Sequence, residues 1–160
     1  MPMGQLRHCP IVYYEVKTMN ENINKILDEK FGFDNLISLA TLTDDTPFVR
    51  TVNSYYENGA FYTITHALTK KMKHIEKNPK VAVCSPEWFC GHGIGENIGH
   101  ICDKKNTELA SKLRTVFSEW YDNGHTNEED PHTCILKIKL TDAVLYSNGK
   151  KYDINFNDEN

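Results

Sequence analysis

The sequence lacks several features that would assign a chain of 160 residues to a particular class of protein. No apolar stretch is long enough to cross a bilayer, and the first residues lack the apolar core of a secretory signal. Arginine occurs at only three positions and the formal net charge is -4, which disfavours a polyanion such as nucleic acid as the main ligand. We therefore expect a cytoplasmic protein that binds neither a membrane nor nucleic acid.

Cysteine is too sparse, and odd in number, for a framework of disulfides. The five cysteines are widely spread, so complete pairing would leave one thiol over. Reduced thiols in a cytosolic protein fit this pattern better. The positions are Cys9, Cys84, Cys90, Cys102 and Cys134.

Most of the chain has the pattern of short strands joined by tight turns. Residues 44–47 and the dipeptides Asn58-Gly59 and Asn148-Gly149 have the composition of turns between paired strands. A β-prone run at residues 10–16 is either an added edge strand or an extended arm. The predicted strands cover residues 36–43, 48–56, 60–65, 81–84, 134–140, 143–146 and 151–156.

Three segments have apolar residues at helical spacing. One covers residues 20–31, one begins after Thr69 and is stopped by Asn78-Pro79, and one covers residues 106–121. In the last of these, aromatic residues such as Trp120 are expected in the core or in a dimer contact. Many short strands with a few peripheral helices predict an α+β fold built on a closed or partly closed antiparallel barrel, because closure removes exposed sheet edges. At this length we expect a single domain over residues 1–160, with its core at about residues 20–156.

The helix that follows Thr69 has an unusual distribution of charge. Lys70, Lys71 and Lys73 all fall in its first turn, where the positive end of the helix dipole favours acids over cations. A phosphate would satisfy the exposed backbone N–H groups and the ammonium groups together. Fully solvated lysines would also be tolerated there, so the pattern suggests an anion site without requiring one.

The motifs around this turn resemble the pyridoxamine 5'-phosphate oxidase family. Each motif alone is weak, but their order and spacing over about residues 36–83 are fairly specific. The matching segments are Leu39-Ala40-Thr41, Pro47-Phe48-Val49-Arg50-Thr51-Val52, Phe61-Tyr62-Thr63-Ile64-Thr65, Thr69-Lys70-Lys71 and Ile75-Glu76-Lys77-Asn78-Pro79-Lys80-Val81-Ala82-Val83.

This resemblance implies a split β-barrel that forms a homodimer and binds FMN at the dimer interface. Arg50 and Lys71 would contact the flavin phosphate, with Thr69 and Lys70 beside them. An arginine suits this role because its planar fork matches phosphate oxygens. The strand residues that would line the isoalloxazine ring and the ribityl chain are Val52, Asn53, Tyr62, Thr63, Ile64 and Thr65.

The function that the resemblance implies is an FMN-dependent oxidoreductase of the flavin reductase or oxidase type. It would act on an unidentified small molecule, with NAD(P)H as a candidate electron donor. The vitamin B6 oxidase itself is disfavoured, because residues 146–153 lack the arginines with which that enzyme holds its substrate phosphate. The short family members grouped with general stress proteins or nitroimidazole-resistance reductases are more similar. No catalytic acid or base is assigned, since His66 is more readily explained as a surface histidine than as a proton donor.

Two other functions stay open. The first is a binding module that holds flavin or haem without turnover. The second is a zinc-binding domain, because Cys90 and His92, and likewise His100 and Cys102, alternate within the segment 84–102 as two ligands on one face of a strand would. The spacing lacks the usual two-residue gap between paired cysteines, so no metal ligand is assigned.

The same segment is rich in glycine, with Gly91, Gly93, Gly95 and Gly99. A dinucleotide-binding loop is disfavoured, because no strand, helix and downstream acid are arranged around these glycines. We expect a bulged barrel strand followed by a loop near the flavin ring.

Overall fold

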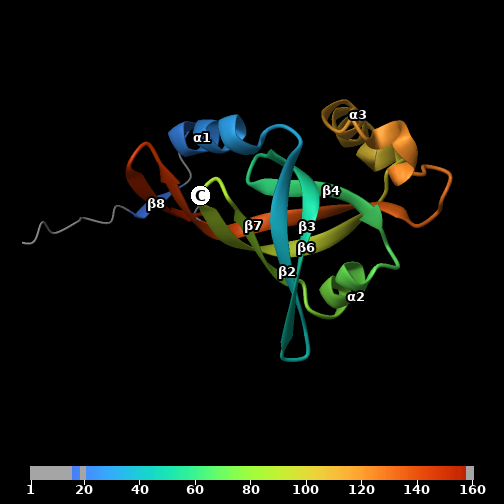
Figure 1. Ribbon diagram of the computed structural model, residues 1–160, viewed down its shortest axis with the longest axis horizontal. Helices are drawn as coiled ribbons and strands as arrows, with labels where there is room; N and C mark the ends of the chain where they lie inside the picture. Colours follow the sequence, from blue (N-terminus) through green and yellow to red (C-terminus); the bar gives the residue numbers. More distant parts are fainter. Residues whose placement is uncertain (1–15, 19–20, 158–160) are drawn as a thin grey trace, which may run out of the picture.

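The computed structural model describes residues 16–18 and 21–157, and a closed antiparallel β-barrel forms its centre (Figure 1). The barrel strands follow one another in the order β7-β4-β3-β2-β5-β6, and β6 pairs again with β7. This architecture confirms the predicted α+β fold with a split antiparallel barrel. The bounds are β2 Asn35–Thr43, β3 Thr46–Glu57, β4 Ala60–His66, β5 Lys80–Ser85, β6 Phe89–His100 and β7 Thr133–Ser147.

Two short strands extend the sheet beyond β7. β8 (Lys150–Asn155) pairs with β7 in antiparallel fashion, and β1 (Val16–Thr18) pairs with β8 in parallel. The predicted β-prone run at residues 10–16 lies outside the described residues except for Val16, where β1 begins. Within the described part of the chain, no helix is long and apolar enough to cross a membrane.

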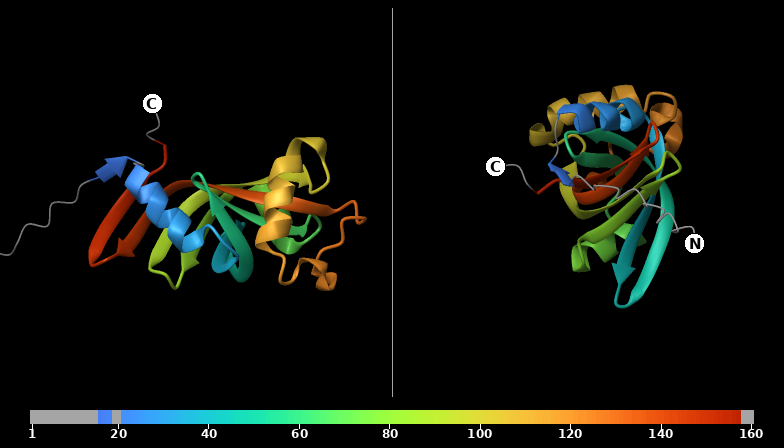
Figure 2. Two further views of the ribbon diagram at one scale, coloured as in Figure 1. Left: turned by 90° about the horizontal axis from the view of Figure 1, so that it is seen from above. Right: turned by 90° about the vertical axis from the view of Figure 1, so that its left-hand side faces the viewer.

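The hairpins form where the turn residues predict them. Asn58 and Gly59 join β3 to β4 with φ values of 47° and 79°. Asparagine and glycine tolerate this left-handed region, which is why the dipeptide closes a tight hairpin. The β2–β3 hairpin projects from the barrel, as Figures 1 and 2 show.

The last part of the sheet differs from the prediction. Residues 134–140 and 143–146, predicted as two strands, belong to the single long strand β7. The register shifts where His92 pairs with Asp142 and Gly93 with Leu140, which leaves Thr141 as an extra residue on β7. A bulge bends a strand without ending it, so β7 can pair within the barrel and with β8.

Apolar residues of the strands fill the barrel. On β6, the buried positions that follow Phe89 are Gly91, Gly93 and Gly95. A Cβ on Gly95 would lie 3.1 Å from the Ile75 side chain, so glycine lets the helix after β4 approach the strand closely. The bulged barrel strand predicted for this glycine-rich segment is confirmed as β6. The large core residues include Ile37, Leu39, Tyr56, Phe61, Val83, Phe89, Leu136 and Ile138.

Three helices surround the barrel (Figures 1 and 2). α1 (Glu21–Phe31) and α3 (Thr107–Val116) lie over one side of it, and α2 (Lys70–Lys77) lies on the opposite side. α1 buries one apolar stripe, and the Phe31 ring at its end contacts two aromatic rings of the barrel. α3 packs on the outer surface of β4 and β7 through a separate apolar cluster.

The third predicted helix, residues 106–121, is shorter than expected. A 3-10 turn, η1 (Lys104–Asn106), precedes α3. The helix ends at Val116, and a π-type turn, η2 (Tyr121–His125), lies farther along the chain. The chain turns back at residues 117–120, and Gly124 in η2 adopts φ 95°. Helical spacing continues in the sequence past this point, so periodicity alone does not reveal the end of the helix.

Two of the cysteines are not reduced. Cys84 on β5 and Cys90 on β6 lie directly opposite each other, with a Cα–Cα distance of 4.3 Å, and form a disulfide. The expectation of reduced thiols is therefore wrong for this pair, because it rested on the number of cysteines and not on the register of the hairpin. Cys102 and Cys134 are free thiols, while Cys9 lies outside the described residues.

Candidate functional site

A cavity of about 390 Å³ opens where β3 and β4 separate. The β3–β4 ladder has only three residue pairs, and the one farthest from the turn joins Tyr55 to Tyr62. Beyond this pair, Val52 and Asn53 of β3 and Thr63 and Ile64 of β4 line the cavity without pairing with each other. Backbone groups on these facing edges are therefore available to hydrogen-bond a ligand.

Half of the residues predicted to hold a cofactor line this one cavity. They are Val52, Asn53, Thr63, Ile64 and Lys71, contributed by β3, β4 and α2. Trp120 and His125, from the segment after α3, complete the lining. The cavity thus combines apolar walls with a few polar groups, as small-molecule sites usually do.

Arg50 lies on β3 beside Lys71 and has no acidic partner among the described residues. Its Nη1 donates to the carbonyl oxygens of Leu39 and Phe48 at 3.2 and 3.0 Å. Burial lowers the pKa of Arg50, and burial together with the charge of Arg50 lowers the pKa of Lys71. Two neighbouring cations without an acid destabilise each other, and an anion would relieve this repulsion.

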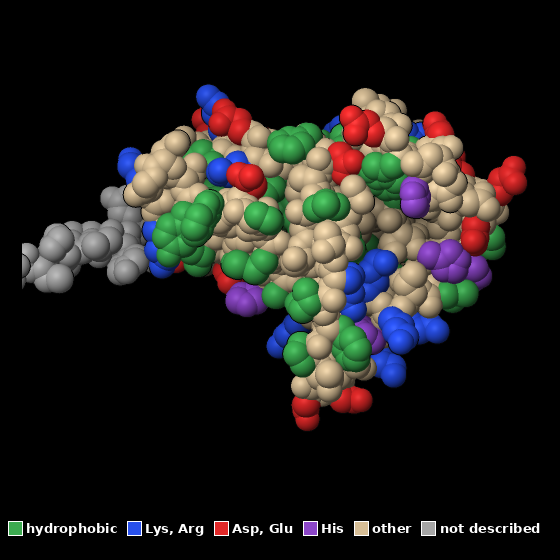
Figure 3. Space-filling model, in the orientation of Figure 1, with side chains coloured by type: hydrophobic (Ala, Val, Ile, Leu, Met, Phe, Trp, Pro, Cys, Tyr) green, Lys and Arg blue, Asp and Glu red, His purple; other side chains and the backbone are tan. Residues whose placement is uncertain are grey.

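Thr69 and Lys70 stand at the start of α2, next to this pair of cations. The Thr69 hydroxyl does not cap the helix and instead donates to the His66 carbonyl oxygen at 2.9 Å. The N–H groups of the first helical turn therefore lack a side-chain cap and are open to an external acceptor. Lys70 is exposed. Figure 3 shows the Lys and Arg side chains that gather over the α2 region of this face.

A buried threonine connects Arg50 to a histidine of α2. Arg50 Nη1 donates to Thr41 Oγ1 at 2.6 Å, and Thr41 Oγ1 lies 3.0 Å from His74 Nδ1. Because a guanidinium only donates, Thr41 accepts from Arg50 and is left with its own proton for His74. Thr41 and His74 are not among the predicted site residues. The signal that could have identified Thr41 is its place in the motif Leu39-Ala40-Thr41.

One carboxylate fixes two residues of the cavity wall. Asp34 accepts a hydrogen bond from Asn53 Nδ2 at 2.9 Å and one from Trp120 Nε1 at 2.7 Å. Trp120, expected in the core or a dimer contact, is thereby held against the cavity. No sequence signal identifies this link, because Asp34 and Trp120 are 86 positions apart.

Tyr62, Thr65 and His66 are not part of the cavity lining. Tyr62 packs against the apolar cluster beneath α3, and burial raises the pKa of its hydroxyl. Thr65 pairs with Cys134 on β7, and His66 Nε2 lies 3.2 Å from Asp130 Oδ2. A ligand in the cavity would thus contact the middle of β4, at Thr63 and Ile64, and not its ends.

The alternating Cys and His residues of segment 84–102 do not gather into a metal centre. Cys90 is in the disulfide, His92 Nδ1 lies 2.7 Å from Asp142 Oδ1, and His100 Nε2 lies 2.9 Å from the Asp130 carbonyl oxygen. No group of three or more His, Cys, Asp or Glu residues in the described ranges could hold a metal ion. The zinc interpretation therefore has no structural support.

The chain is similar in sequence to a bacterial stress protein, although no family model matches it. General stress protein 26 of Bacillus subtilis (strain 168) is 27% identical over 115 residues, which cover 71% of this chain and 81% of that protein. The solved structure of general stress protein 26 from Bacillus anthracis str. Sterne has a TM-score of 0.64 and 16% identity, and the match covers 82% of this chain and 98% of that one.

Further solved structures share the fold. A Clostridium acetobutylicum protein, described as related to general stress protein 26 and placed in the pyridoxinephosphate oxidase family, matches at a TM-score of 0.58 and 14% identity, over 87% of this chain and 98% of its own. A FAD-binding protein from Mesorhizobium loti matches at 0.57 and 16%, over 78% and 92% of the two chains. A heme binding protein from Mycobacterium smegmatis matches at 0.56 and 13%, over 76% and 52%. At these identities the likeness establishes the fold.

Proposed function

Because the chain resembles the pyridoxamine 5'-phosphate oxidase family in its sequence motifs and in its fold, we propose that it is an FMN-binding oxidoreductase that acts on a small molecule. The observation that carries the proposal is the pair Arg50 and Lys71, two neighbouring cations without an acidic partner among the described residues, of which Lys71 lines the cavity between β3 and β4. A phosphate supplies the missing charge.

The size and the chemistry of the cavity support FMN as the ligand. Its volume of about 390 Å³ lies within the range of roughly 300–1,000 Å³ that is usual for small-molecule sites. Arg50, Lys71 and the first turn of α2 would hold the phosphate, with Thr69 and Lys70 beside them. The unpaired backbone edges of β3 and β4 and the Asn53 amide would form hydrogen bonds with the polar edge of the flavin ring. Ile64 and Trp120 would contact its apolar surface.

Bound FMN supplies a ring that accepts and returns a hydride or single electrons. The chain's own residues position and shield this ring. Asp34 keeps Asn53 and Trp120 at the cavity wall through two hydrogen bonds, and the apolar side chains exclude water. Among the residues that line the cavity, His125 and Lys71 are the ones that can hold a proton near the ring.

The reaction proposed is not that of the vitamin B6 oxidase. That reaction needs cations for a second phosphate, on the substrate. Arg114 is the second arginine among the described residues, and it is bound to Glu128 through Nε at 2.7 Å. This contact supports an unidentified substrate without a phosphate group.

The proposal includes a homodimer. Leu36 and Val49 lie on the outer face of the β2–β3 hairpin and are 56% and 68% exposed. Apolar side chains exposed on a projecting hairpin are typical of a surface that another chain covers, and a second copy would also bring residues to the flavin. Sedimentation of wild-type protein and of Val49→Glu tests this part: we expect a dimer that dissociates in the variant, and a monomeric wild type would contradict it. NAD(P)H as electron donor and a cytoplasmic location complete the proposal.

Haem is a second candidate ligand. His125 lines the cavity and offers an imidazole nitrogen, which suits haem iron. Lys71 and Arg50 would then face the propionates. The absorption spectrum of the loaded protein separates the two ligands, and His125→Ala would change the spectrum of bound haem if His125 holds the iron.

Titration of the purified protein with FMN tests the main proposal. We expect saturable binding at one site per chain, followed by bleaching of the flavin when NADH or NADPH is added without oxygen. A protein that fails to bind FMN would overturn the cofactor assignment. Bound flavin that stays oxidised with both donors would instead identify a binding module without turnover.

A further inference from the structure

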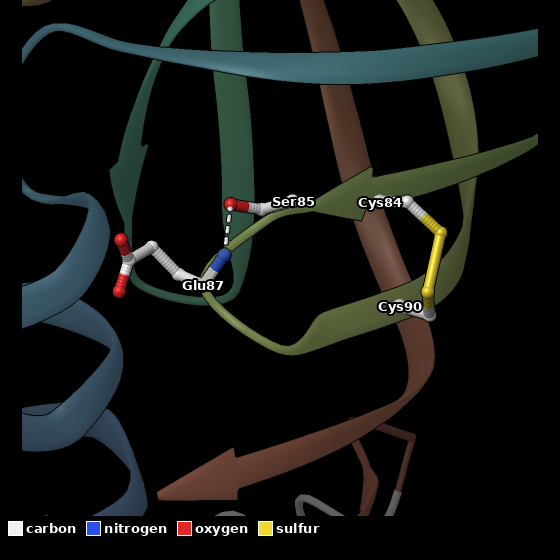
Figure 4. The surroundings of a disulfide bond; sticks show 4 residues. All are labelled: Cys84, Ser85, Glu87 and Cys90. Carbon is white, nitrogen blue, oxygen red and sulfur yellow. Dashed lines mark hydrogen bonds between the residues drawn. A yellow bond between two sulfur atoms is a disulfide. The ribbon is translucent and has the colours of Figure 1, made fainter.

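The Cys84–Cys90 disulfide lies on the outer surface of the barrel, where β5 and β6 approach their connecting turn (Figure 4). Both cysteines are exposed. Their neighbours in the adjacent strands are Ser38, opposite Cys84, and Val144, opposite Cys90. No bulky or charged side chain therefore flanks the bond in its own row of the sheet. Exposed disulfides are the ones that take part in exchange reactions.

The hairpin does not depend on this bond for its shape. Only six positions separate the two cysteines, and β5 and β6 are already paired from Lys80 with Ile94 to Ser85 with Phe89. The stabilisation expected from a cross-link increases with the length of the loop that it closes. The loop closed here is short, so the stabilisation expected from this bond is smaller than that from a disulfide that closes a long loop.

An apolar pocket of about 360 Å³ adjoins Cys90. Trp88 and Tyr146 line it and are 73% and 49% exposed. Trp88 also has φ 60°, a left-handed conformation that is costly for a bulky residue, and its carbonyl oxygen accepts a hydrogen bond from the Tyr146 N–H at 3.0 Å. Strain together with an exposed indole marks a surface that is kept for a ligand.

We propose that this pocket and the disulfide form a second site, at which the Cys84–Cys90 disulfide exchanges with a low-molecular-weight thiol. The thiol occupies the pocket and its thiolate attacks Cys90 Sγ, because Cys90 lines the pocket and Cys84 does not. A new S–S bond to Cys90 forms, the Cys84–Cys90 bond breaks, and its electron pair leaves on Cys84. A second thiolate attacks the thiol's sulfur in this mixed disulfide and releases Cys90. Two thiols are oxidised to one disulfide, and the two cysteines are reduced with two protons.

The carboxylates near the disulfide are engaged by other side chains. His92 follows Cys90 by two positions on the same face of β6, and it engages the Asp142 carboxylate at 2.7 Å. The Glu87 side chain points away from the disulfide toward α1 (Figure 4), where it lies 3.7 Å from Lys30 Nζ. Asp142 and Glu87 thus each have a side-chain partner within the described residues.

Native-state thiol labelling tests the proposal. The oxidised full chain, with Cys9→Ser and Cys102→Ser so that the buried Cys134 is the one thiol left outside the disulfide, is incubated with reduced glutathione, alkylated and mapped by mass spectrometry. We expect new labels at Cys84 and Cys90 while the fold is kept. In addition, oxidised glutathione should form a stable adduct with Cys90 in a Cys84→Ser variant, and a slower one with Cys84 in Cys90→Ser.

The pocket is tested by a matched pair of variants. Trp88→Ala should slow the exchange about tenfold, the effect of losing one aromatic contact. Ile94→Ala removes an exposed apolar residue of β6 that lies outside the pocket and should leave the rate unchanged. Labels that appear only after denaturation, equal adduct rates at the two cysteines, or equal rates in these two variants would each overturn the proposal.

Discussion

Arg50 and Arg114 are the two arginines of the described residues, and their surroundings are opposite. Arg114 donates to Glu128 through Nε and Nη2 at 2.7 and 3.1 Å, and these hydrogen bonds raise its pKa. Arg50 meets carbonyl oxygens and a hydroxyl, and burial lowers its pKa. An arginine that stabilises the fold has its acid within the chain. An arginine that lacks an acidic partner and lies next to a second cation, as Arg50 does, is suited to bind an anion from outside the chain.

The paired arginine, Arg114, also supports the cavity that Lys71, the neighbour of Arg50, lines. Glu128 accepts hydrogen bonds from Arg114 and from the Tyr121 hydroxyl, and these two contacts lower its pKa to about 2. Tyr121 directly follows Trp120, which Asp34 holds from the other side. The segment that closes the cavity is thus held by side-chain hydrogen bonds at Trp120 and at Tyr121, so both regions contribute to one site.

The largest effect should come from removing the unpaired cations. Arg50→Ala and Lys71→Ala each delete a charge-assisted phosphate contact of about 1.5–3 kcal/mol, so the Kd for FMN should rise roughly ten- to hundredfold. Lys73→Ala is the matched control, because Lys73 lies in the same helical turn but is exposed and outside the cavity lining. Fluorescence titration measures all three. Unchanged affinity in both Arg50→Ala and Lys71→Ala would show that the phosphate lies elsewhere.

A substitution in the region around Arg114 and Glu128 should lower the stability of the protein. Glu128→Gln weakens the contacts to Arg114 and Tyr121, and we expect the free energy of unfolding to fall by about 1–2 kcal/mol after allowance for the partial exposure of these groups. The folded pKa of Glu128 is depressed to about 2, so its contribution is present above the ordinary carboxyl value and is lost as the pH falls toward 2. Urea unfolding at pH 7 and pH 3 measures both. Glu129→Gln, an exposed neighbour, serves as control, and equal losses in the two variants would contradict the assigned role.

The sequence predicts the surroundings of Arg50 better than those of Arg114. Arg50, Thr69 and Lys71 lie in short motifs of one hairpin and the following helix, so their proximity follows from local structure. Lysines in the first turn of a helix are also conspicuous in the sequence itself, because the helix dipole disfavours cations there. The closed barrel follows from alternating strands and turn dipeptides for the same reason.

Contacts between distant segments cannot be predicted in this way. Trp120 reaches Asp34 only because α3 ends at Val116 and the chain turns back, and helical spacing continues past that point in the sequence. Cys84 pairs with Cys90 through the register of one hairpin, which a count of cysteines does not contain. Such contacts depend on tertiary packing, whereas periodicity reports only the local chain.

The next effect concerns the threonine that orients the unpaired arginine. Thr41→Val removes the hydroxyl between Arg50 and His74 while it keeps the volume. Loss of one buried hydrogen bond is worth about 1 kcal/mol, so FMN affinity should fall about fivefold. Thr43→Val, two positions along β2, is the control because no hydrogen bond from its side chain is found within the described residues. The titration used for Arg50 measures both, and equal affinities in the two variants would remove Thr41 from the site.

The smallest effect is the pH dependence that Lys71 imposes on binding. Burial and Arg50 lower its pKa below the ordinary lysine value, so Lys71 loses its proton at a lower pH than an exposed lysine. A phosphate favours the charged form, hence FMN affinity should be constant near neutral pH and fall by about threefold as the pH rises through this lowered pKa. Lys71→Arg keeps its charge throughout and should abolish the fall. The ionisation of the flavin itself affects both proteins equally, so the difference between their curves isolates Lys71; superimposable curves would show that its ammonium group does not contact the phosphate.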